Sequence, residues 1–258
     1  MKFIKACEEM ANLVEDSISD LIGEKKAGDF VKMGADGTPT KLIDKIAEDI
    51  IVEFLTSNNL CGKIISEELG NIVIGNGAGT VYLDPLDGTH NAISGIPFYA
   101  MSVAYAENGR VIKGYVKDLA HGETFYAIHG EGAYRNGKKI ICSDTAFLKE
   151  STLSIYGRKF APETIVGLGR QIRRWRLMGA SALELCYVGC GRIDGFVDIR
   201  DTLRVTDAAA GMLICTEAGG IVTGKCGEPA IYPDLVSEGR CLIATNGIIH
   251  QKIIEYLG

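Results

Sequence analysis

Two aspartates beside a glycine stand out in residues 84–89, whose sequence is D-P-L-D-G-T. A short apolar run ends at Leu83, so Asp84 and Asp87 leave the end of a predicted strand together. Carboxylate oxygens are the ligands that hard cations such as Mg²⁺ prefer, whereas zinc prefers histidine and cysteine. The residue types and their spacing therefore predict a magnesium site.

The two residues after Asp87 suit an anion. Gly88 lets the backbone approach a ligand closely, and the amides of Gly88 and Thr89 would point outward where a helix over 90–94 begins. The start of a helix favours negative charge. A metal ion and a phosphate group would then lie side by side.

Three further carboxylates stand at the ends of predicted elements. Asp44 lies in the first turns of a helix, Glu67 follows a strand, and Asp207 begins a helix whose next residues are small enough for close approach. Glu68 is expected to be solvated or hydrogen-bonded, because adjacent residues cannot easily face one point. The alternatives are that Asp44 only complements a helix dipole and that Asp207 only caps its helix.

The order of these motifs resembles that of the inositol monophosphatase and fructose-1,6-bisphosphatase superfamily. The matching stretches are S-E-E-L-G at 66–70, D-P-L-D-G-T at 84–89, T-D-A-A at 206–209 and E-A-G-G at 217–220. The short chain and G-F-V-D-I-R at 195–200 look most like the archaeal dual-activity branch. The resemblance spans nearly the whole chain and implies a layered α/β/α/β/α sandwich of the sugar phosphatase type.

The resemblance implies ligands for two or three Mg²⁺ ions, namely Glu67, Asp84, Asp87 and Asp207 with the backbone carbonyl of Leu86. It also implies that Asp44 and Thr89 polarise the attacking water, which Glu67 and one metal hold in place. Such a site needs no covalent phosphoenzyme, because positioning and neutralisation of phosphoryl charge can carry the reaction.

Arginines near Asp207 offer the local cations that an acidic protein needs for a phosphorylated substrate. Arginine makes planar, bidentate contacts to phosphate that lysine cannot reproduce. In the resemblance, the positions that contact substrate are Asp87, Gly88, Thr89, Arg176, Ser181 and Arg200. The alternative for any single arginine is a solvated surface residue, which is the expectation for Arg173 and Arg174.

The activity implied is Mg²⁺-dependent hydrolysis of inositol monophosphate and fructose-1,6-bisphosphate. One alternative is a phosphatase for adenosine 3′,5′-bisphosphate, whose purine would need an apolar shelf that the sequence does not show. The other is a catalytically silent scaffold protein. Against it stand the acids at 44, 67, 84, 87 and 207, because an idle site has no reason to keep a repulsive cluster.

The elements that must position these residues differ between the two halves. Apolar spacing predicts helices over 3–23 and 41–58, the second capped by Thr40. Strands are expected at 62–66, 80–84, 98–107, 110–118, 123–128 and 152–156. This half is α+β.

The second half alternates between helices and strands, as an α/β layer does. Helices are expected at 161–170, 180–190, 205–218 and from 247, with strands at 174–178, 193–199, 220–223 and 241–245. We therefore divide the chain into an α+β subdomain at 1–148, which holds the metal site, and an α/β subdomain at 149–258, which completes it.

The segment from Glu24 to Pro39 is rich in glycine, lysine and aspartate and has no clear period, so it is expected to be a loop. The resemblance implies that this loop closes over the metals. Asp36 would then help to hold a third Mg²⁺ or the attacking water. The alternative is a solvated hairpin.

The composition limits the classes of partner that the protein can bind. The 258 residues carry a net charge of −6 with a pI near 5.3, which argues against nucleic acid and anionic membranes, because both require a basic footprint. No apolar run is long enough to span a bilayer, and the eight cysteines form no C-x-x-C pair. We expect a cytoplasmic homodimer with reduced thiols and a small phosphorylated polyol or sugar as substrate.

Overall fold

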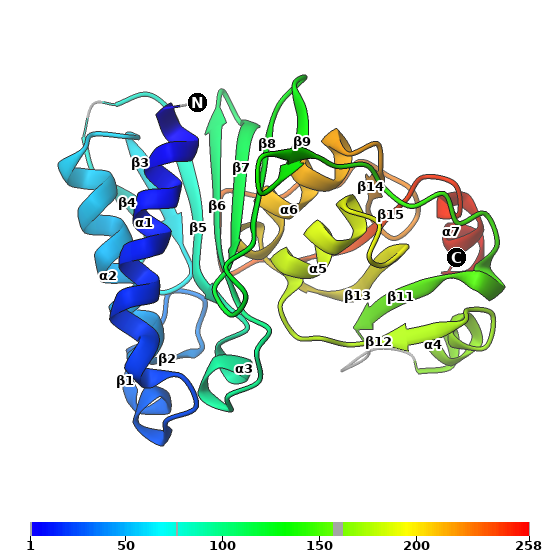
Figure 1. Ribbon diagram of the computed structural model, residues 1–258, viewed down its shortest axis with the longest axis horizontal. Helices are drawn as coiled ribbons and strands as arrows, with labels where there is room; N and C mark the ends of the chain where they lie inside the picture. Colours follow the sequence, from blue (N-terminus) through cyan, green and yellow to red (C-terminus); the bar gives the residue numbers. More distant parts are fainter. Residues whose placement is uncertain (1, 76, 157–161, 258) are drawn as a thin grey trace.

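Two mixed sheets, each covered by helices on both faces, give the chain five layers (Figure 1). The computed structural model describes residues 2–75, 77–156 and 162–257. The outer helices of the first sheet are α1 (Lys2–Ile18) and α2 (Leu42–Ser57), the central pair is α5 (Ser181–Gly189) and α6 (Val205–Glu217), and the second sheet is closed by α4 (Pro162–Gly169) and α7 (His250–Leu257). This confirms the predicted α/β/α/β/α sandwich.

The first sheet has eight strands in the order β10-β9-β8-β7-β6-β5-β3-β4. Neighbours are antiparallel except β3 and β5, which run parallel. Because helices cover both faces, the central strands are apolar throughout rather than alternating. The strands are β3 (Lys63–Ser66), β4 (Gly70–Val73), β5 (Thr80–Asp87), β6 (Ala100–Glu107), β7 (Arg110–Asp118), β8 (Thr124–Ile128), β9 (Gly132–Arg135) and β10 (Lys138–Lys139).

The second sheet has five strands in the order β12-β11-β13-β15-β14. The first three are parallel, and β15 is antiparallel to both of its neighbours. They are β11 (Thr152–Tyr156), β12 (Arg174–Arg176), β13 (Gly195–Leu203), β14 (Ile221–Thr223) and β15 (Arg240–Thr245). The predicted alternation of the second half agrees with these elements, although residue 161, where a helix was expected to begin, lies outside the described residues.

The boundary between the sheets falls between β10 and β11, close to the division that we drew at residue 148. Both central helices nevertheless come from the second half of the chain and pack on the first sheet as well as the second. No helix in the described part of the chain is long and apolar enough to cross a bilayer.

The helix predicted over 3–23 is too long, because α1 ends at Ile18 and a 3-10 turn over Ser19–Leu21 follows. The hydroxyl of Ser19 donates to the carbonyl of Asp16, at 2.9 Å, and such local bonds compete with helix continuation. The apolar spacing beyond residue 18 reflects the burial of Leu21 in that turn.

Thr40 does not cap the second helix. The N-cap of α2 is Lys41, while Thr40 is fully buried in the short strand β2 (Pro39–Lys41) and its hydroxyl donates to the carboxylate of Glu68. Glu68 thus has the hydrogen-bonded role that was expected of it.

The segment before α2 is more regular than predicted. It contains a 3-10 turn over Lys25–Gly28 and a two-stranded hairpin of β1 (Phe30–Met33) and β2. Most of its side chains are exposed, including 61% of Phe30, so no apolar period marks it in the sequence. The edge strand β4 was not predicted, for the same reason. We refer to residues 30–41 as the β1–β2 hairpin.

Candidate metal and phosphate site

Strand β5 continues past its predicted end and carries both aspartates of the D-P-L-D-G-T motif. Asp84 lies opposite Ser102 of β6, and Asp87 lies opposite Ala100, so three steps along β5 match two steps along β6. The extra residue is a β-bulge, which offsets the alternation of side chains and lets two carboxylates three apart face the same region.

Glu67, Asp84 and Asp207 converge at one end of the first sheet. Each offers a carboxylate oxygen, and these oxygens all lie within 4.8 Å of one another. Glu67 follows β3, Asp84 lies in the parallel neighbour β5, and Asp207 occupies the first turn of α6. We call these three residues the acid cluster. The structure thus brings together acids from three separate elements, as the sequence predicted.

Asp87 faces the first turn of α5. Its Oδ2 accepts a hydrogen bond from the amide of Ala182 at 2.6 Å. The start of a helix offers such free amides and favours a negative charge. This contact fixes the carboxylate of Asp87 at the wall between the two halves of the chain.

The acids of the site resist ionisation. Burial, followed by repulsion from neighbouring carboxylates, raises the pKa of Asp84 and Asp87 well above the usual range. Burial also raises the pKa of Glu67 to about 8, although Arg204 opposes that shift. A cation at this point would favour the ionised form of all these groups.

Arg204 contacts the acid cluster, whereas the sequence marked it only as a local cation near Asp207. It is the N-cap of α6, and its guanidinium reaches Glu67 at 2.6 Å, Asp207 at 3.1 Å and also Asp36. Asp36 lies in the turn of the β1–β2 hairpin, where its Oδ1 also accepts the amide of Thr38 at 2.8 Å. The only signal in the sequence was the spacing of three residues between Arg204 and Asp207 at a helix start.

Asp44 and Thr89 lie beside the cluster and contact each other. The hydroxyl of Thr89 is 2.8 Å from Oδ1 of Asp44 and 3.0 Å from the carbonyl of Leu86, and it can donate to one of them at a time. Burial raises the pKa of Asp44 to about 7, an effect that the bond from Thr89 reduces. A carboxyl group with that pKa can take up and release a proton near neutral pH.

The acids open onto a cleft of about 500 Å³ between the two halves. Of the residues predicted to contact substrate, Asp87, Ser181 and Arg200 line it. Several of the other lining residues carry no signal in the sequence, among them Tyr156, Asp201, Thr202 and Ser237. Gly88 adopts φ +91°, and a Cβ there would lie 2.9 Å from the carbonyl oxygen of Phe98, so this corner accepts only glycine without strain.

The two arginines predicted to bind substrate occupy different surroundings. Arg200 faces the cleft, forms a two-point ion pair with Asp198 at 2.9 and 2.6 Å, and lies 4.5 Å over the ring of Tyr156. Arg176 lies on the exposed edge strand β12 and donates to the carbonyl of Trp175 at 3.3 Å. Arg176 is absent from the described residues that line the cleft.

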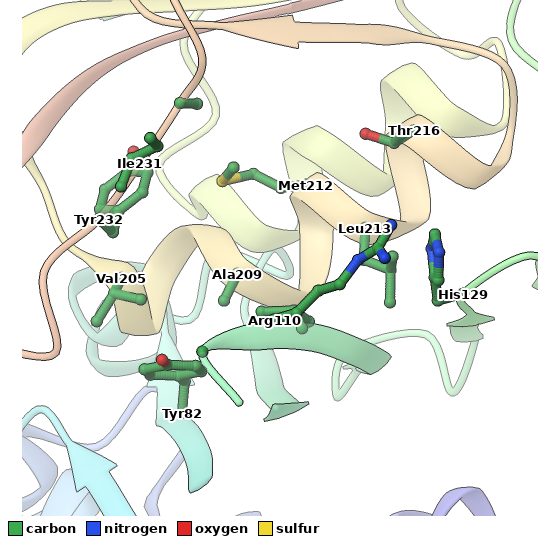
Figure 2. Close-up of a pocket in the computed structure, with 13 residues that line it drawn as sticks. Tyr82, Arg110, His129, Val205, Ala209, Met212, Leu213, Thr216, Ile231 and Tyr232 are labelled. Carbon is green, nitrogen blue, oxygen red and sulfur yellow. The ribbon is translucent and has the colours of Figure 1, made fainter. Parts of the chain in front are cut away.

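A second pocket, of about 360 Å³, lies along another face of α6 (Figure 2). Val205, Ala209 and Leu213 form its floor, and the side chains of Tyr82 and Tyr232 approach from either side. The described residues that line this pocket include no carboxylate. It therefore lacks the ligands of a magnesium site, and the acids locate the chemistry in the other cleft.

The donor set of the acid cluster fits Mg²⁺. All of its side-chain donors are carboxylate oxygens, and the carbonyl of Leu86 has a second lone pair beside the one that faces Thr89. Burial and mutual repulsion raise the pKa of Glu67 and Asp84 even beside Arg204, so a further cation would stabilise their ionised forms.

Comparison with known proteins agrees with this geometry. The chain is 43% identical to a fructose-1,6-bisphosphatase/inositol-1-monophosphatase of Methanothermobacter thermautotrophicus, over 96% of this chain and 94% of that protein. A bifunctional NADP phosphatase/NAD kinase of Methanococcus maripaludis is 36% identical over 100% of this chain and 50% of its own length. The solved structure of the MJ0109 gene product, an inositol monophosphatase-fructose 1,6 bisphosphatase, superposes with a TM-score of 0.90 at 32% identity and covers 100% of both chains.

A family model places the chain among these proteins. The model described as the inositol monophosphatase family matches residues 3–258, which is nearly the full length. The chain belongs to the inositol monophosphatase family.

Proposed function

We propose that this protein is a Mg²⁺-dependent phosphatase that hydrolyses inositol monophosphate and fructose-1,6-bisphosphate. The observation that carries the proposal is the acid cluster, of which Glu67 and Asp207 line the cleft, with the hydrogen-bonded Thr89–Asp44 pair beside it. Its relative of 43% identity bears both activities in its name.

In this proposal Glu67, Asp84, Asp87 and Asp207, with the carbonyl of Leu86, hold two or three Mg²⁺ ions. Bound magnesium would supply a lowered water pKa and neutralise charge on the phosphoryl group. The protein fixes its ligands by backbone contacts: the amide of Leu86 donates to Asp84 at 3.1 Å, and the amide of Arg204 donates to Asp207 at 3.2 Å.

Thr89 and Asp44 orient and deprotonate the attacking water. The Thr89 hydroxyl donates to Asp44 and can accept a hydrogen bond from water at the same time, so a proton can pass through the hydroxyl to the carboxylate. A direct attack by water leaves no phosphoenzyme, and the chain needs no nucleophilic side chain in the cleft.

The phosphorylated substrate lies in the cleft between the acids and Arg200. Ser181, which lines the cleft, and the amides of Gly88 and Thr89, which follow the lining residue Asp87 in the chain, contact the phosphate that is cleaved, and Arg200 contacts a second anionic or polar group. Arg176 contributes only if the exposed strand that carries it comes next to the cleft. Asp36, at the tip of the hairpin, closes the opposite side.

The two alternatives weighed from the sequence are not favoured. The relatives reported above are named as enzymes, which disfavours a silent scaffold, and none is named for adenosine 3′,5′-bisphosphate. The NADP phosphatase relative adds a different nucleotide monoester to the substrates that merit assay.

A substrate panel tests the proposal. Phosphate release from inositol 1-phosphate, fructose-1,6-bisphosphate, adenosine 3′,5′-bisphosphate and NADP is measured with Mg²⁺ and after chelation. We expect turnover of the first two substrates, lost on chelation and restored by Mg²⁺. Turnover that persists without divalent cations would overturn the metal assignment, and turnover restricted to the nucleotides would overturn the substrate assignment.

The homodimer and the cytoplasmic location expected from the sequence remain proposals. Sedimentation equilibrium of the purified chain tests the first, and fractionation of cells that produce the tagged protein tests the second.

A further inference from the structure

Arg204 ties three separate elements together at the acid cluster. Its Nη1 reaches Oε1 of Glu67 after β3 and Oδ2 of Asp36 in the β1–β2 hairpin. Its Nε and Nη2 hold the two oxygens of Asp207, both at 3.1 Å. The planar guanidinium suits this arrangement, because its donors point in fixed directions and can serve several carboxylates at once.

Arg204 also supplies the local positive charge. Among the ion pairs of the described residues, every one that reaches Asp36, Glu67 or Asp207 comes from Arg204. The Arg204 side chain is only 21% exposed, so solvent screens these pairs weakly. Carboxylates crowded in such surroundings repel one another unless a cation lies between them.

A metal ion in the acid cluster needs the same groups. Glu67 is both a member of the cluster and a partner of Arg204, so a divalent cation and the guanidinium approach one carboxylate from neighbouring directions. A Mg²⁺ ion and a guanidinium that contact the same carboxylate repel each other, and each weakens the binding of the other to Glu67.

We propose that Arg204 is an internal counter-cation that stabilises the acid cluster without metal and competes with Mg²⁺ for Glu67 and Asp36. This inference rests on the proposed metal-dependent function, and it assigns Arg204 the role of setting how tightly the metal is held. Arg204 is a positioning residue in this scheme, since it acts on the metal ligands.

The same contact links the metal site to the hairpin. In the described residues, Asp36 meets the cluster through Arg204 and otherwise bonds to Thr38 of its own turn. Loss of the Arg204 side chain should therefore release the turn around Asp36 from the cluster, even in the absence of metal, while Ala35 and Thr40 still bond to Glu68.

Calorimetric titration of the metal-free protein with MgCl₂, without substrate, tests the competition. Arg204→Gln keeps a hydrogen-bonding side chain and removes the charge, and it should lower the Kd for Mg²⁺ at least tenfold. Arg192→Gln is the matched control, because Arg192 loses the same charge but pairs with Glu123 outside the cleft. Its Kd should stay within about twofold of the wild type.

Arg204→Lys provides a second variant that keeps the charge and loses the planar fork. Its Kd should lie between those of the wild type and Arg204→Gln, and circular dichroism checks that both variants fold. Hydrogen exchange of the metal-free Arg204→Gln protein should be at least tenfold faster than in the wild type at the turn amides of residues 34–38, which the Asp36 contact holds.

The sign of the change separates the possible results. A purely structural role predicts weaker Mg²⁺ binding in Arg204→Gln, since loosened acids hold a cation less well, so an unchanged or raised Kd overturns the counter-cation role. If the wild type and Arg204→Gln both fail to bind Mg²⁺, the metal site and the role of Arg204 fall together. If the wild type binds Mg²⁺ and Arg204→Gln does not differ, only the role of Arg204 falls.

Discussion

The acidic and the cationic sides of the cleft are built in different ways. The acids lie on ends of buried elements and are held by main-chain donors: Asp84 by the amide of Leu86 and Asp87 by the amide of Ala182. The two arginines differ from the acids and from each other. Arg200 is held by a side chain, since it pairs with Asp198, whereas Arg176 lies exposed on an edge strand.

This contrast separates what is fixed from what can change. The positions of the acids follow from the bulge in β5 and the starts of α5 and α6, so they cannot shift without a change in the fold. The cations depend on a few side chains with other partners. A substitution on the cationic side can therefore alter substrate preference without moving the acids.

Substitution of the acids, whose positions the fold fixes, should have the largest effect on activity. Asp84→Asn and Asp87→Asn should each lower kcat by about 10³-fold or more, the order of loss when a group that stabilises transition-state charge is removed. The thermal midpoint of the metal-free proteins should not fall, because each change removes a buried, repelled carboxylate whose pKa is raised. Activity at saturating Mg²⁺ and thermal melts are the measurements.

Asp49→Asn is the control for these variants, since Asp49 is exposed and pairs with Lys45 of its own helix. Near-wild-type turnover of Asp84→Asn or Asp87→Asn at saturating Mg²⁺ would show that the framework does not hold the metal.

A smaller effect should follow a change beside the cluster. Thr89→Ala should lower kcat by about 10²-fold, the lower end of what general acid–base groups contribute, with KM nearly unchanged. Thr89→Ser should recover most of the activity, because it restores the hydroxyl that faces Asp44 at 2.8 Å. Steady-state kinetics decide the matter, and a change confined to KM would make Thr89 a substrate-binding residue.

Substitution of the arginines should change KM. Arg200→Ala should raise KM for fructose-1,6-bisphosphate by about tenfold, as expected for one lost charge-assisted hydrogen bond, and by less for inositol monophosphate. Arg176→Ala should act in the same direction but more weakly, because Arg176 is exposed outside the cleft. Arg200→Lys retains the charge beside Asp198 and checks for a folding defect. Equal effects on both substrates would show that neither arginine reads the second phosphate.

The smallest effect concerns a buried histidine that lies on neither side of the cleft. The amide of Gly247 donates to the Thr245 hydroxyl, whose own proton can be donated to Nδ1 of His250 at 3.1 Å. The Thr223 hydroxyl donates to the carbonyl of Gly224, so it accepts from Nε2 at 3.0 Å. This network suits the neutral ring, and burial lowers the pKa of His250 from its ordinary value.

A lowered pKa gives the sign of the pH dependence. Below about pH 6.5 the unfolded chain binds a proton that the folded protein does not, so the free energy of unfolding falls as pH falls. His250→Asn should remove this contribution, which is at most about 1.4 kcal/mol per pH unit. Urea unfolding between about pH 7 and pH 5 measures it, with the exposed His90→Asn as control. Parallel pH profiles for the wild type and His250→Asn would contradict the assignment.

The sequence alone was sufficient to predict a site residue where that residue lies at the end of an element whose apolar pattern is also visible. Asp84, Glu67 and Asp207 end or begin apolar elements, and ends of elements meet at one edge of a layered fold. The pairing of Asp44 with Thr89 spans 45 positions, so only the family resemblance suggested it.

The sequence was insufficient where contacts join unrelated segments. Nothing local connects Asp36 with Arg204, which are 168 positions apart, and the hairpin that brings Asp36 to the site buries too little to leave a pattern. The role of Arg204 depends on three elements at once. Such positions follow from tertiary packing and not from propensity.

Helix α6 lies so close to its neighbours that two glycines set the depth of Asp207. A Cβ on Gly114 of β7 would lie 2.8 Å from the carbonyl oxygen of Ala210, and one on Gly211 would lie 2.6 Å from Cβ of Leu185 in α5. A larger residue at either position must push the helix, and the proposed metal ligand Asp207 with it, out of place. In a saturation library selected for phosphatase activity, positions 114 and 211 would therefore be as intolerant as the acids themselves, although neither faces the substrate.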